Sequence, residues 1–490
     1  MAAVERPSPP GDYDVVVVGS GPGGLQTAYC LRRLGVRHAV ISRDQQPGGM
    51  FRRFPVYQRL ISWTKPDAPA ERGSRDYEWY DHNSLLADEP ELKALVPPLM
   101  DRAYDLPSRP EMEAGLAAFA ERAALGIRHG CAWEATRHDG ERFVLETTDG
   151  QYRCRAVVFA LGVTEPWRAE VPGLEDVPHY VDTLTPERYA GRDVFIVGKR
   201  NSGFELAQGL LPWARSIVLG SPRPVEIGTL ALSPLRLRYL SPYEEYVRGA
   251  PGTYVVNVMI ERVEPRDGGF RLVLHGTTWD GTLELSVDDV IAATGFQTPL
   301  RDLPGLGLAT VADGRIPALT PFWESVSLPG AFFAGNATQG AHGAGRHSPV
   351  ASSSAVSGFR YNARVLAEHL AERLGGWSRP RPRVEEAVPF LLGELTRSPE
   401  LRIQKGYLCR MLSAGEEGYA DEGIVPLTHF LDGGSPDAVA ATIEIDETGR
   451  MVPTVYLRRG GEVAEHPLEP HPLHQYEGEA YAAELGSLLA

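Results

Sequence analysis

Two stretches of the chain share one pattern, in which a β-branched apolar run is followed by glycines and then by apolar residues at helical spacing. The first stretch opens with the apolar run 13–18, and Leu31 and Leu34 mark the helical face that follows it. An uninterrupted apolar run is typical of a parallel strand that is buried on both faces. The pattern therefore predicts a strand, a tight turn and a helix, with a second strand at 38–42.

The second stretch repeats this order from residue 192 onwards. The strand-like run 192–197, which is apolar from Val194 onwards, leads into a glycine-containing loop, and a helix is expected from Phe204 to Leu210. A further strand is expected at 216–219. Two strand–turn–helix units with parallel strands predict an α/β fold with two Rossmann-like domains.

The first loop spans residues 19–24 and reads G-S-G-P-G-G, a G-x-G-x-x-G motif between a strand and a helix. In this context the motif indicates dinucleotide binding. Glycines let backbone N–H groups approach a pyrophosphate at the positive end of the helix. We expect Gly19, Gly21 and Gly24 to make this approach.

The residue that would bind the ribose of this dinucleotide is less clear. The motif normally has an acid at the end of the second strand. Ser42 and Arg43 stand there instead, and Asp44 follows. We keep Ser42 and Arg43 as the candidate ribose ligands.

The second loop spans residues 198–203 and reads G-K-R-N-S-G, with Arg200 in place of the middle glycine. A guanidinium there can pair with phosphate oxygens, or it can block productive binding of the nucleotide, and both interpretations stay open. The candidate ligands in this loop are Gly198, Arg200, Asn201, Ser202 and Gly203.

The strand after the second loop ends without an acid, and Ser221 and Arg223 follow it. An acid at this position favours the free 2′-hydroxyl of NAD, whereas a cation suits a 2′-phosphate. The sequence therefore favours NADPH, with Arg223 as a ligand. The alternative is that Arg223 is a solvated surface cation.

Composition excludes several classes of function. The chain has 490 residues and a formal net charge of −15, which disfavours nucleic acid as a partner. No segment approaches the length needed to span a membrane, and the Pro-rich start lacks the apolar stretch of a signal peptide. We therefore expect a cytoplasmic protein.

The cysteines and histidines argue against thiol and metal chemistry. The four cysteines are widely spaced and form no C-x-x-C pair, which disfavours disulfide reductase chemistry. His466, His471 and His474 are interrupted by prolines and match no familiar metal site. No metal is expected.

Taken together, these motifs resemble flavoproteins with two dinucleotide-binding domains, which include the class B flavin monooxygenases. The similarity is closest to the FAD-dependent oxidoreductase domain-containing family. It covers roughly residues 12–375, and the segments that carry it are 19–24, 48–51, 60–62, 82–86, 201–205, 293–296 and 358–361.

The resemblance implies a particular chemistry. FAD binds the first loop, and NADPH binds the second and reduces the flavin. The reduced flavin then takes up O2 to form a C4a-hydroperoxide, which oxygenates a nucleophilic atom of a small molecule. A dry pocket is required, because water would convert the hydroperoxide into hydrogen peroxide.

The resemblance also implies further site residues. Gly49 and Phe51 lie beside the flavin, Gly335 and Asn336 approach its ribityl and pyrophosphate groups, and the helix that starts near 353–357 points at its pyrimidine ring. The small-residue turns with Gly162 and Gly295 are counted with the cofactor-binding residues.

The catalytic residues are less defined. Trp63 stands where the flavin monooxygenases have an asparagine, and Asn83 or Lys65 would then supply the polar group. Ordinary loop roles for Asn83 and Lys65 remain the alternative. His342 and His347 are read as acid–base groups or as capping residues.

The two small-residue turns bracket the second loop, so the NADPH domain is expected as an insertion in the FAD domain. The expected division is a disordered N-terminus at 1–11, an FAD-binding domain at 12–165 and 288–375, an NADPH-binding domain at 166–287, and a small C-terminal α+β extension at 376–490. The extension is read as a lid or a dimer arm, which leaves a homodimer open.

Three functions are consistent with these residues and motifs. The first is an NADPH- and O2-dependent FAD monooxygenase, with N-hydroxylation of an amine or amino acid in secondary metabolism as the expected reaction. The second is an NADPH-dependent flavin reductase that passes electrons to a protein or quinone. The third is a flavin-binding scaffold with low turnover.

Overall fold

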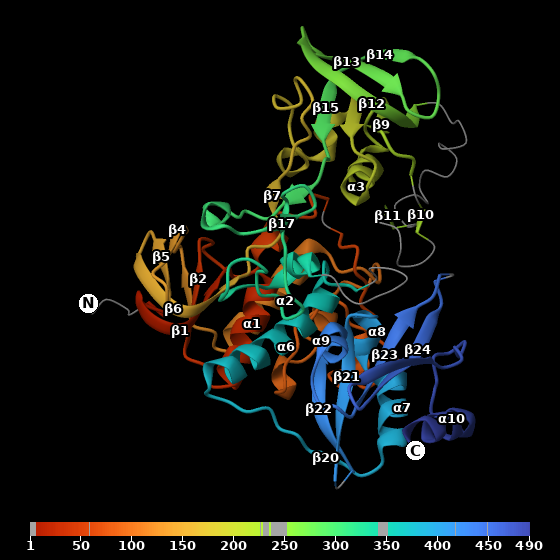
Figure 1. The fold of residues 1–490 in the computed structure, drawn as a ribbon. Helices are drawn as coiled ribbons and strands as arrows, with labels where there is room; N and C mark the ends of the chain where they lie inside the picture. Colours follow the sequence, from red (N-terminus) through yellow and green to blue (C-terminus); the bar gives the residue numbers. More distant parts are fainter. Residues whose placement is uncertain are drawn as a thin grey trace. The chain divides into compact units, whose positions relative to one another are not determined.

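The computed structural model describes residues 6–57, 59–225, 227–228, 235–236, 252–341, 351–416, 418–447 and 449–490. The chain divides into two compact units (Figure 1). Unit 1 comprises Met1–Arg52, Ser62–Val163 and Thr298–Ala490, and unit 2 comprises Arg53–Ile61 and Thr164–Gln297. His342 and His347 lie outside the described residues.

Unit 1 contains a seven-stranded sheet. Its strands are β1 (Gly11–Val18), β2 (His38–Ser42), β3 (Ile127–His129), β4 (Trp133–His138), β5 (Phe143–Thr147), β6 (Gly150–Phe159) and β19 (Ala331–Phe333). Strands β3, β2, β1 and β6 run parallel in this order, and β19 pairs with β6. The valines at 15–18 of β1 are buried because both faces of this sheet are covered.

Helices and short turns cover this sheet and connect its strands. The helices are α1 (Pro22–Arg33), α2 (Arg109–Arg122) and α6 (Val356–Leu374), and α1 packs against α6. The connecting 3-10 turns and short strands are η1 (Gly49–Arg52), η2 (Asp76–Trp79), η3 (Pro90–Leu92), η4 (Pro97–Leu99), η8 (Leu303–Leu306), β17 (Thr310–Val311), β18 (Ile316–Pro317) and η9 (Gly335–Gly340).

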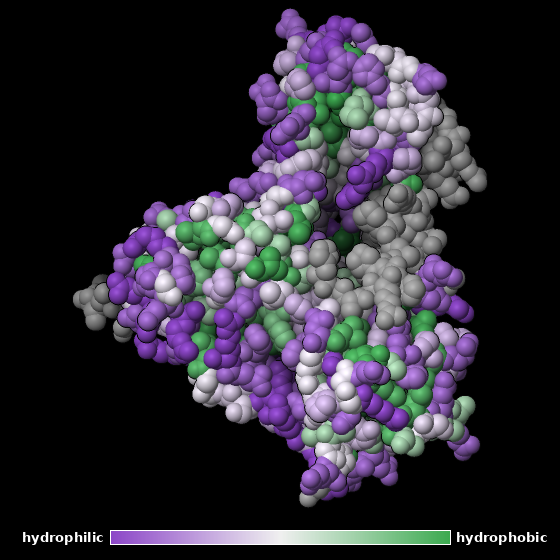
Figure 2. Space-filling view, in the orientation of Figure 1, coloured by the Kyte–Doolittle hydropathy of each residue, from purple (hydrophilic) through white to green (hydrophobic). Residues whose placement is uncertain are grey.

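Unit 2 contains a six-stranded sheet in the order β14-β13-β12-β9-β8-β15. Its elements are β8 (Asp193–Val197), α3 (Asn201–Leu210), β9 (Ser216–Ser221), β12 (Thr253–Arg266), β13 (Gly269–Gly276), β14 (Thr282–Val287) and β15 (Asp289–Ala292). The outer strands β13 and β14 are antiparallel, and Figure 2 shows a mostly hydrophilic surface over them. Smaller elements are β7 (Glu165–Pro166), η5 (Tyr180–Asp182), η6 (Pro186–Tyr189), β10 (Ile227–Gly228), β11 (Leu235–Arg236) and β16 (Phe296–Gln297).

The C-terminal extension is a second sheet of unit 1, in the order β20-β22-β21-β23-β24-β25 and antiparallel throughout. It is built from β20 (Arg383–Val384), α7 (Ala387–Arg397), α8 (Pro399–Ile403), β21 (Leu408–Gly415), β22 (Gly418–Pro426), α9 (Leu427–Asp432), β23 (Ala438–Ile445), β24 (Met451–Arg459), β25 (Glu462–Pro467) and α10 (Glu479–Leu489).

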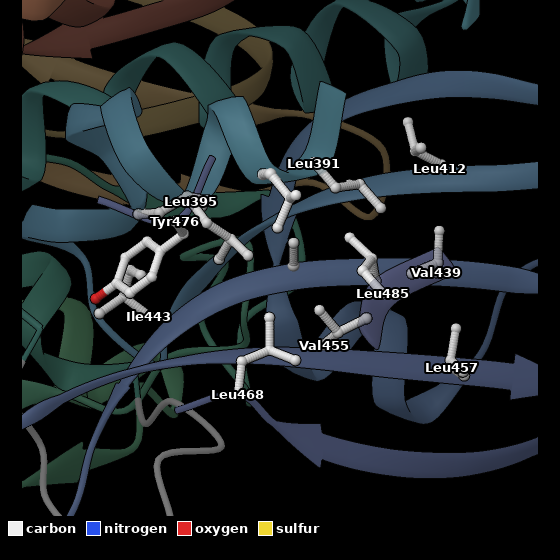
Figure 3. Close-up of a cluster of buried hydrophobic side chains, with 13 residues drawn as sticks. Leu391, Leu395, Leu412, Val439, Ile443, Val455, Leu457, Leu468, Tyr476 and Leu485 are labelled. Carbon is white, nitrogen blue, oxygen red and sulfur yellow. The ribbon is translucent and has the colours of Figure 1, made fainter. Parts of the chain in front are cut away.

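The core of the extension lies between the sheet and two of its helices. Leu391 and Leu395 of α7 and Leu485 of α10 are buried against Val439 of β23 and Val455 of β24 (Figure 3). A second cluster, which includes Phe430 of α9, also packs on β21 and β23. The α/β fold with two Rossmann-like domains and an α+β extension is thus confirmed.

The structure differs from the expected domain limits in two places. β15 pairs in parallel with β8, so its residues belong to the sheet of unit 2 and not to the FAD-binding domain that was expected to resume at 288. The segment 53–61 also groups with unit 2. A strand that completes a sheet is assigned by its partner, which local sequence does not reveal.

The N-terminus also differs from the expected disordered segment 1–11. From residue 6 onwards it is held in place, since Arg6 pairs with Asp149 at 3.1 Å and the Ser8 hydroxyl donates to the Gly126 carbonyl at 2.6 Å. β1 begins at Gly11. These long-range contacts compensate for the polar, Pro-rich composition.

Among the described residues, no helix combines the length and the apolar character that a membrane crossing requires.

The close packing of Gly24 leads to a stability prediction. A Cβ atom at Gly24 would lie 2.0 Å from the Gly19 carbonyl oxygen, so Gly24→Ala must displace backbone and should destabilise the protein by about 2 kcal/mol. Thermal unfolding measures this as a fall in Tm. Gly305→Ala is the matched control, because nothing lies within 4 Å of its added Cβ. An unchanged Tm for Gly24→Ala would contradict the prediction.

Candidate functional site

The first glycine loop brings backbone segments unusually close together. Gly19 has φ +118°, and the Cβ positions of two further glycines are blocked by backbone. An added Cβ at Gly23 would lie 2.4 Å from Gly335 Cα, and one at Gly49 would lie 2.8 Å from Gly21 Cα. The start of α1 therefore meets both η9 and η1 through bare backbone.

Gly21 differs from its neighbours in the loop. Its added Cβ has its nearest neighbour, Gly49 Cα, at an ordinary 3.7 Å, so packing within the protein does not require glycine there. In a dinucleotide-binding loop, a glycine at this position lets the backbone approach the pyrophosphate closely. The loop thus fits the pyrophosphate of a dinucleotide at the start of α1.

Ser42 lies at the end of β2, where the motif would have an acid. It is 3% exposed, and its Oγ accepts hydrogen bonds from the Ser20 hydroxyl at 2.8 Å and the Asp44 N–H at 3.2 Å. Arg43 is exposed. Of these two predicted ribose ligands, Ser42 is therefore the one that the structure ties to the glycine loop.

The turns after β6 and β19 are joined by Asn336. Its Oδ1 accepts a hydrogen bond from the Val163 N–H at 2.9 Å. Gly162, with φ +71°, and Gly335, with φ +75°, flank this contact. The predicted residues Gly162, Gly335 and Asn336 are thus brought together at the carboxyl ends of the parallel strands, where open α/β sheets bind ligands.

The second glycine loop repeats the backbone packing in unit 2. A Cβ at Gly203 would lie 2.3 Å from the Gly198 carbonyl oxygen, and one at Gly198 would lie 2.4 Å from that of Ala293. Arg200 is the N-cap residue of α3 and its side chain is exposed, while Asn201 and Ser202 are half-buried. Gly295, with φ +102°, accepts a hydrogen bond from the Trp167 N–H at 3.0 Å.

Lys199 is a residue that sequence reasoning missed. It is only 5% exposed, and its Nζ donates to the Val256 carbonyl at 2.8 Å and to Asn257 Oδ1. Asn257 is the pairing partner of Ser221 at the end of β9. A buried ammonium therefore lies at the strand end where the 2′-group of a bound nucleotide is recognised.

Among the described residues, no carboxylate forms an ion pair with Lys199. Burial lowers the pKa of its ammonium to about 8. Arg223, the predicted ligand nearby in sequence, is exposed. The dinucleotide motif allows any residue at position 199, so the motif gave no signal there. The one signal in the sequence is the rarity of lysine, since the chain has just three other lysines, Lys65, Lys93 and Lys405.

The catalytic candidates divide into two groups. Asn83 is 1% exposed, and its amide donates to the Ser62 carbonyl at 3.0 Å and to Thr64 Oγ1 at 2.9 Å. These bonds hold the turn that carries Trp63, whose ring lies 4.4 Å from that of His82. Lys65, in contrast, is exposed. Asn83 therefore positions Trp63, and the structure does not bring Lys65 into this group.

Glu205 of α3 anchors the segment 53–61 within unit 2. Its carboxylate is 8% exposed, accepts a hydrogen bond from the Tyr57 N–H at 2.9 Å and accepts another from the Tyr180 hydroxyl. Burial raises the pKa of Glu205 to about 7. The acid lies in α3, two residues after the last glycine of the loop.

Charged side chains join the extension to the segment 75–84 of unit 1, and the two carboxylates among them are buried. Arg75 binds both oxygens of Glu394, at 2.6 and 2.9 Å, and Glu400 at 3.0 Å. On the other side, Arg360 of α6 donates to the Ser84 carbonyl at 2.7 Å and to the Glu78 carbonyl at 2.8 Å. The segment 75–84 is thus bound by α6 on one side and by the extension on the other.

The structure shows where the four cysteines lie and how the potential metal ligands are distributed. Cys30, Cys131, Cys154 and Cys409 are buried and unpaired, and burial raises the pKa of Cys30 to about 11. Over the part of the chain that the structure describes, no three His, Cys, Asp or Glu side chains gather as metal ligands would.

The fold and the two glycine loops define a flavoprotein with two dinucleotide-binding domains, an FAD-dependent oxidoreductase. Residues 16–335 match the pyridine nucleotide-disulphide oxidoreductase family, and the chain belongs to this family.

Two groups of relatives are similar in sequence. The FAD-dependent oxidoreductase domain-containing protein 2 of Mus musculus is 28% identical over 447 residues, which cover 81% of this chain and 62% of the mouse protein. A ferredoxin–NADP reductase of Salinispora arenicola is 30% identical over 335 residues, which cover 67% of this chain and 87% of the reductase. The chain therefore spans less than two thirds of the mouse relative.

Solved structures show the same fold. The flavin-containing monooxygenase from Stenotrophomonas maltophilia has a TM-score of 0.55 and 22% identity, and the match covers 74% of this chain and 99% of the monooxygenase. The bacillithiol disulfide reductase from Bacillus cereus has a TM-score of 0.55 and 20% identity, and the match covers 74% of this chain and 100% of the reductase. At these identities the likeness defines the fold and leaves the reaction open.

The raised pKa of Glu205 predicts a pH dependence of stability. A carboxyl whose pKa is about 7 when folded and near 4.5 when unfolded binds more protons in the folded state between these values, so stability falls as the pH rises through this window. The loss approaches roughly 3 kcal/mol above pH 7. Glu205→Gln should remove this loss of stability. The Tm of the variant, relative to the Tm of the wild-type protein, should therefore rise from pH 5 to pH 8.

Thermal unfolding across this pH range measures the difference. Glu121→Gln, which removes an exposed carboxylate of α2, is the control for the loss of one charge. A Tm difference between Glu205→Gln and wild type that stays constant with pH would contradict the assignment.

Proposed function

We propose that the protein is an NADPH- and O2-dependent FAD monooxygenase that oxygenates a small molecule, with N-hydroxylation of an amine or amino acid as its expected reaction. FAD supplies the redox and oxygen chemistry when it is bound. The protein's own residues then have three tasks, which are to hold the two nucleotides, to exclude water and to orient the substrate.

The first task falls to the two glycine loops. Gly19, Gly21 and Gly24 present the start of α1 to the FAD pyrophosphate, and Ser42 is placed to bind a ribose hydroxyl. Gly49 and Phe51 of η1 adjoin this loop. In unit 2, Gly198, Asn201, Ser202 and Gly203 present α3 to the pyrophosphate of NADPH.

The observation that carries the proposal is the way in which the extension packs on the FAD domain. Gln404, directly after α8, donates to Ser353 Oγ at 3.1 Å, and the Ser352 N–H donates to the Ile403 carbonyl at 3.3 Å. Both serines precede α6, whose start is expected at the flavin. The extension thus supplies a protein wall where a monooxygenase must keep water out.

A buried polar network reinforces this wall. Asn362 of α6 donates to Thr338 Oγ1 of η9 at 3.0 Å and to Ser353 Oγ at 3.1 Å, and Gln404 donates to Asn362 Oδ1. All four side chains are buried. Buried polar groups that bond to one another rigidify the structure around them, which suits a site that has to stay closed during oxygen chemistry.

A second candidate is an NADPH-dependent reductase that passes electrons to a protein or quinone. The 30% identity with a ferredoxin–NADP reductase favours it. Such a reductase needs an accessible flavin edge, which the packing of the extension against the start of α6 opposes.

Product analysis under 18O2 distinguishes the two candidates. The FAD-loaded protein is incubated with NADPH and a panel of amines and amino acids, and products are analysed by mass spectrometry. We expect NADPH consumption to rise with one substrate, whose product carries one 18O atom. Turnover with ferredoxin or a quinone and no labelled product would favour the reductase.

The position of Lys199 supports NADPH as the second nucleotide. Its ammonium lies beside Asn257, which pairs with Ser221, and Arg223 follows two residues later. A 2′-phosphate bound at the end of β9 would meet both cations and would compensate the buried charge of Lys199.

Substitution of these cations should change the choice of nucleotide. Lys199→Met and Arg223→Asp should each raise the KM for NADPH about tenfold or more and leave the KM for NADH nearly unchanged, since NADH lacks the 2′-phosphate. Steady-state reduction of FAD with each nucleotide measures the ratio. Lys199→Arg keeps the charge and should retain the preference.

Equal use of NADPH and NADH by the wild-type protein would refute the 2′-phosphate assignment. If Lys199→Met keeps the wild-type preference for NADPH, residues other than Lys199 bind the 2′-phosphate.

A further inference from the structure

A second pair of cations, Arg402 and Lys405, lies in the extension, outside the two glycine loops. Both meet one indole ring, since Arg402 Cζ lies 5.4 Å and Lys405 Nζ lies 5.9 Å from the centre of the Trp79 ring. Trp79 ends η2, and Arg402 lies in α8, so the group joins the extension to the FAD domain within unit 1.

Little negative charge lies near these two cations among the described residues. In the described part of the chain, no carboxylate forms an ion pair with either of them, although Asp76 acts on Arg402 from a distance. Arg402 donates to the His474 carbonyl at 2.9 Å, which fixes its position. Two like charges beside one ring are unfavourable unless a ligand of opposite charge joins them.

The titration behaviour of this group agrees with a positive local potential. Burial and the neighbouring Arg402 lower the pKa of Lys405 to about 8. Burial, Arg402 and Lys405 lower the pKa of His474. The three groups face each other from α8, the turn after it and the segment after β25, so an anion bound among them would relieve the repulsion of all three.

Aromatic rings continue this cationic group on one side. The Trp79 ring lies 6.1 Å from that of His82, at 70°, and the His82 ring lies 4.4 Å from that of Trp63. All three rings are half-buried. They present apolar area next to the cations, and this combination suits a ligand with an anionic end and an apolar body.

The group also lies next to the start of α6. Gln404 stands between Arg402 and Lys405 in the chain, and it donates to Ser353 Oγ at 3.1 Å. Its own Oε1 is buried and has no hydrogen-bond partner among the described residues. The positive end of the 19-residue helix α6 adds to the attraction for an anion.

We propose that Arg402, Lys405 and Trp79 form the subsite that binds the carboxylate of the substrate, with the apolar body of the substrate on Trp79 and Trp63. The substrate is then a carboxylic acid such as an apolar amino acid. A simple amine, which is protonated at neutral pH, is repelled by the two cations. This inference rests on the proposed function and narrows its substrate class.

Binding of two probes of equal shape tests the subsite. We would titrate the oxidised, FAD-loaded protein with 3-phenylpropanoate and with 3-phenylpropanamide in a calorimeter. The acid should bind about tenfold more tightly than the amide or better, as one charge-assisted hydrogen bond implies. Lys405→Met and Arg402→Met should each remove this difference, and Lys405→Arg should retain it.

The matched control is Lys93→Met, which removes a lysine charge elsewhere in unit 1 and should leave both affinities unchanged. Equal affinity for acid and amide, no binding of the acid, or an unchanged acid affinity in Lys405→Met would overturn the proposal. If Lys405→Met fails to load FAD, the ratio of the wild-type affinities for the acid and for the amide still tests the proposal.

The assay needs neither NADPH nor O2. A failure of the monooxygenase proposal would therefore appear in the 18O2 experiment and leave these affinities intact, whereas a failure of the subsite would appear only here.

Discussion

Both nucleotide-binding units depend on one constraint, the contact of bare backbone with bare backbone at the start of a helix. Gly24 against Gly19 and Gly203 against Gly198 leave no room for a Cβ atom, so each helix can begin close to the ends of its strands. That approach directs the positive end of the helix toward the place of the pyrophosphate. Gly21 is consistent with this approach, because the protein itself has room for a Cβ atom there and a glycine leaves the backbone open to a ligand.

A second constraint is the set of charged side chains that joins the extension to the FAD domain. Arg75, which is partly exposed, binds the buried carboxylates of Glu394 and Glu400, and the buried Arg360 holds the segment 78–84 from the other side. Loss of Arg75 would leave two buried carboxylates without this partner, so the pairing favours the observed packing of the extension. Gln404 of the extension contacts Ser353 just before α6, and Arg402 and Lys405 lie over Trp79. These contacts are the reason for proposing that the extension, which carries no recognisable motif, contributes to the site.

Periodicity in the sequence predicted the elements whose pattern is local. The apolar runs of β1 and β8 and the helices after them appear near their expected positions. β21 and β22 were missed because their signal is a weak alternation that gains meaning only inside the six-stranded sheet. Lys199, Arg402 and Lys405 were missed for a related reason, since each acquires its role from partners far away in sequence. The boundary at 288 failed because β15 is defined by its pairing with β8.

The proposed function requires that NADPH reduces the bound FAD and that a closed site then uses O2 to oxygenate a substrate. Stopped-flow spectroscopy follows both steps: the protein is reduced by NADPH without oxygen and then mixed with O2 and excess 3-phenylpropanoate or an amino acid. We expect loss of the oxidised flavin absorbance, followed by a transient absorbance that belongs neither to reduced nor to oxidised FAD. Direct return of oxidised FAD with stoichiometric hydrogen peroxide under every condition would contradict a monooxygenase.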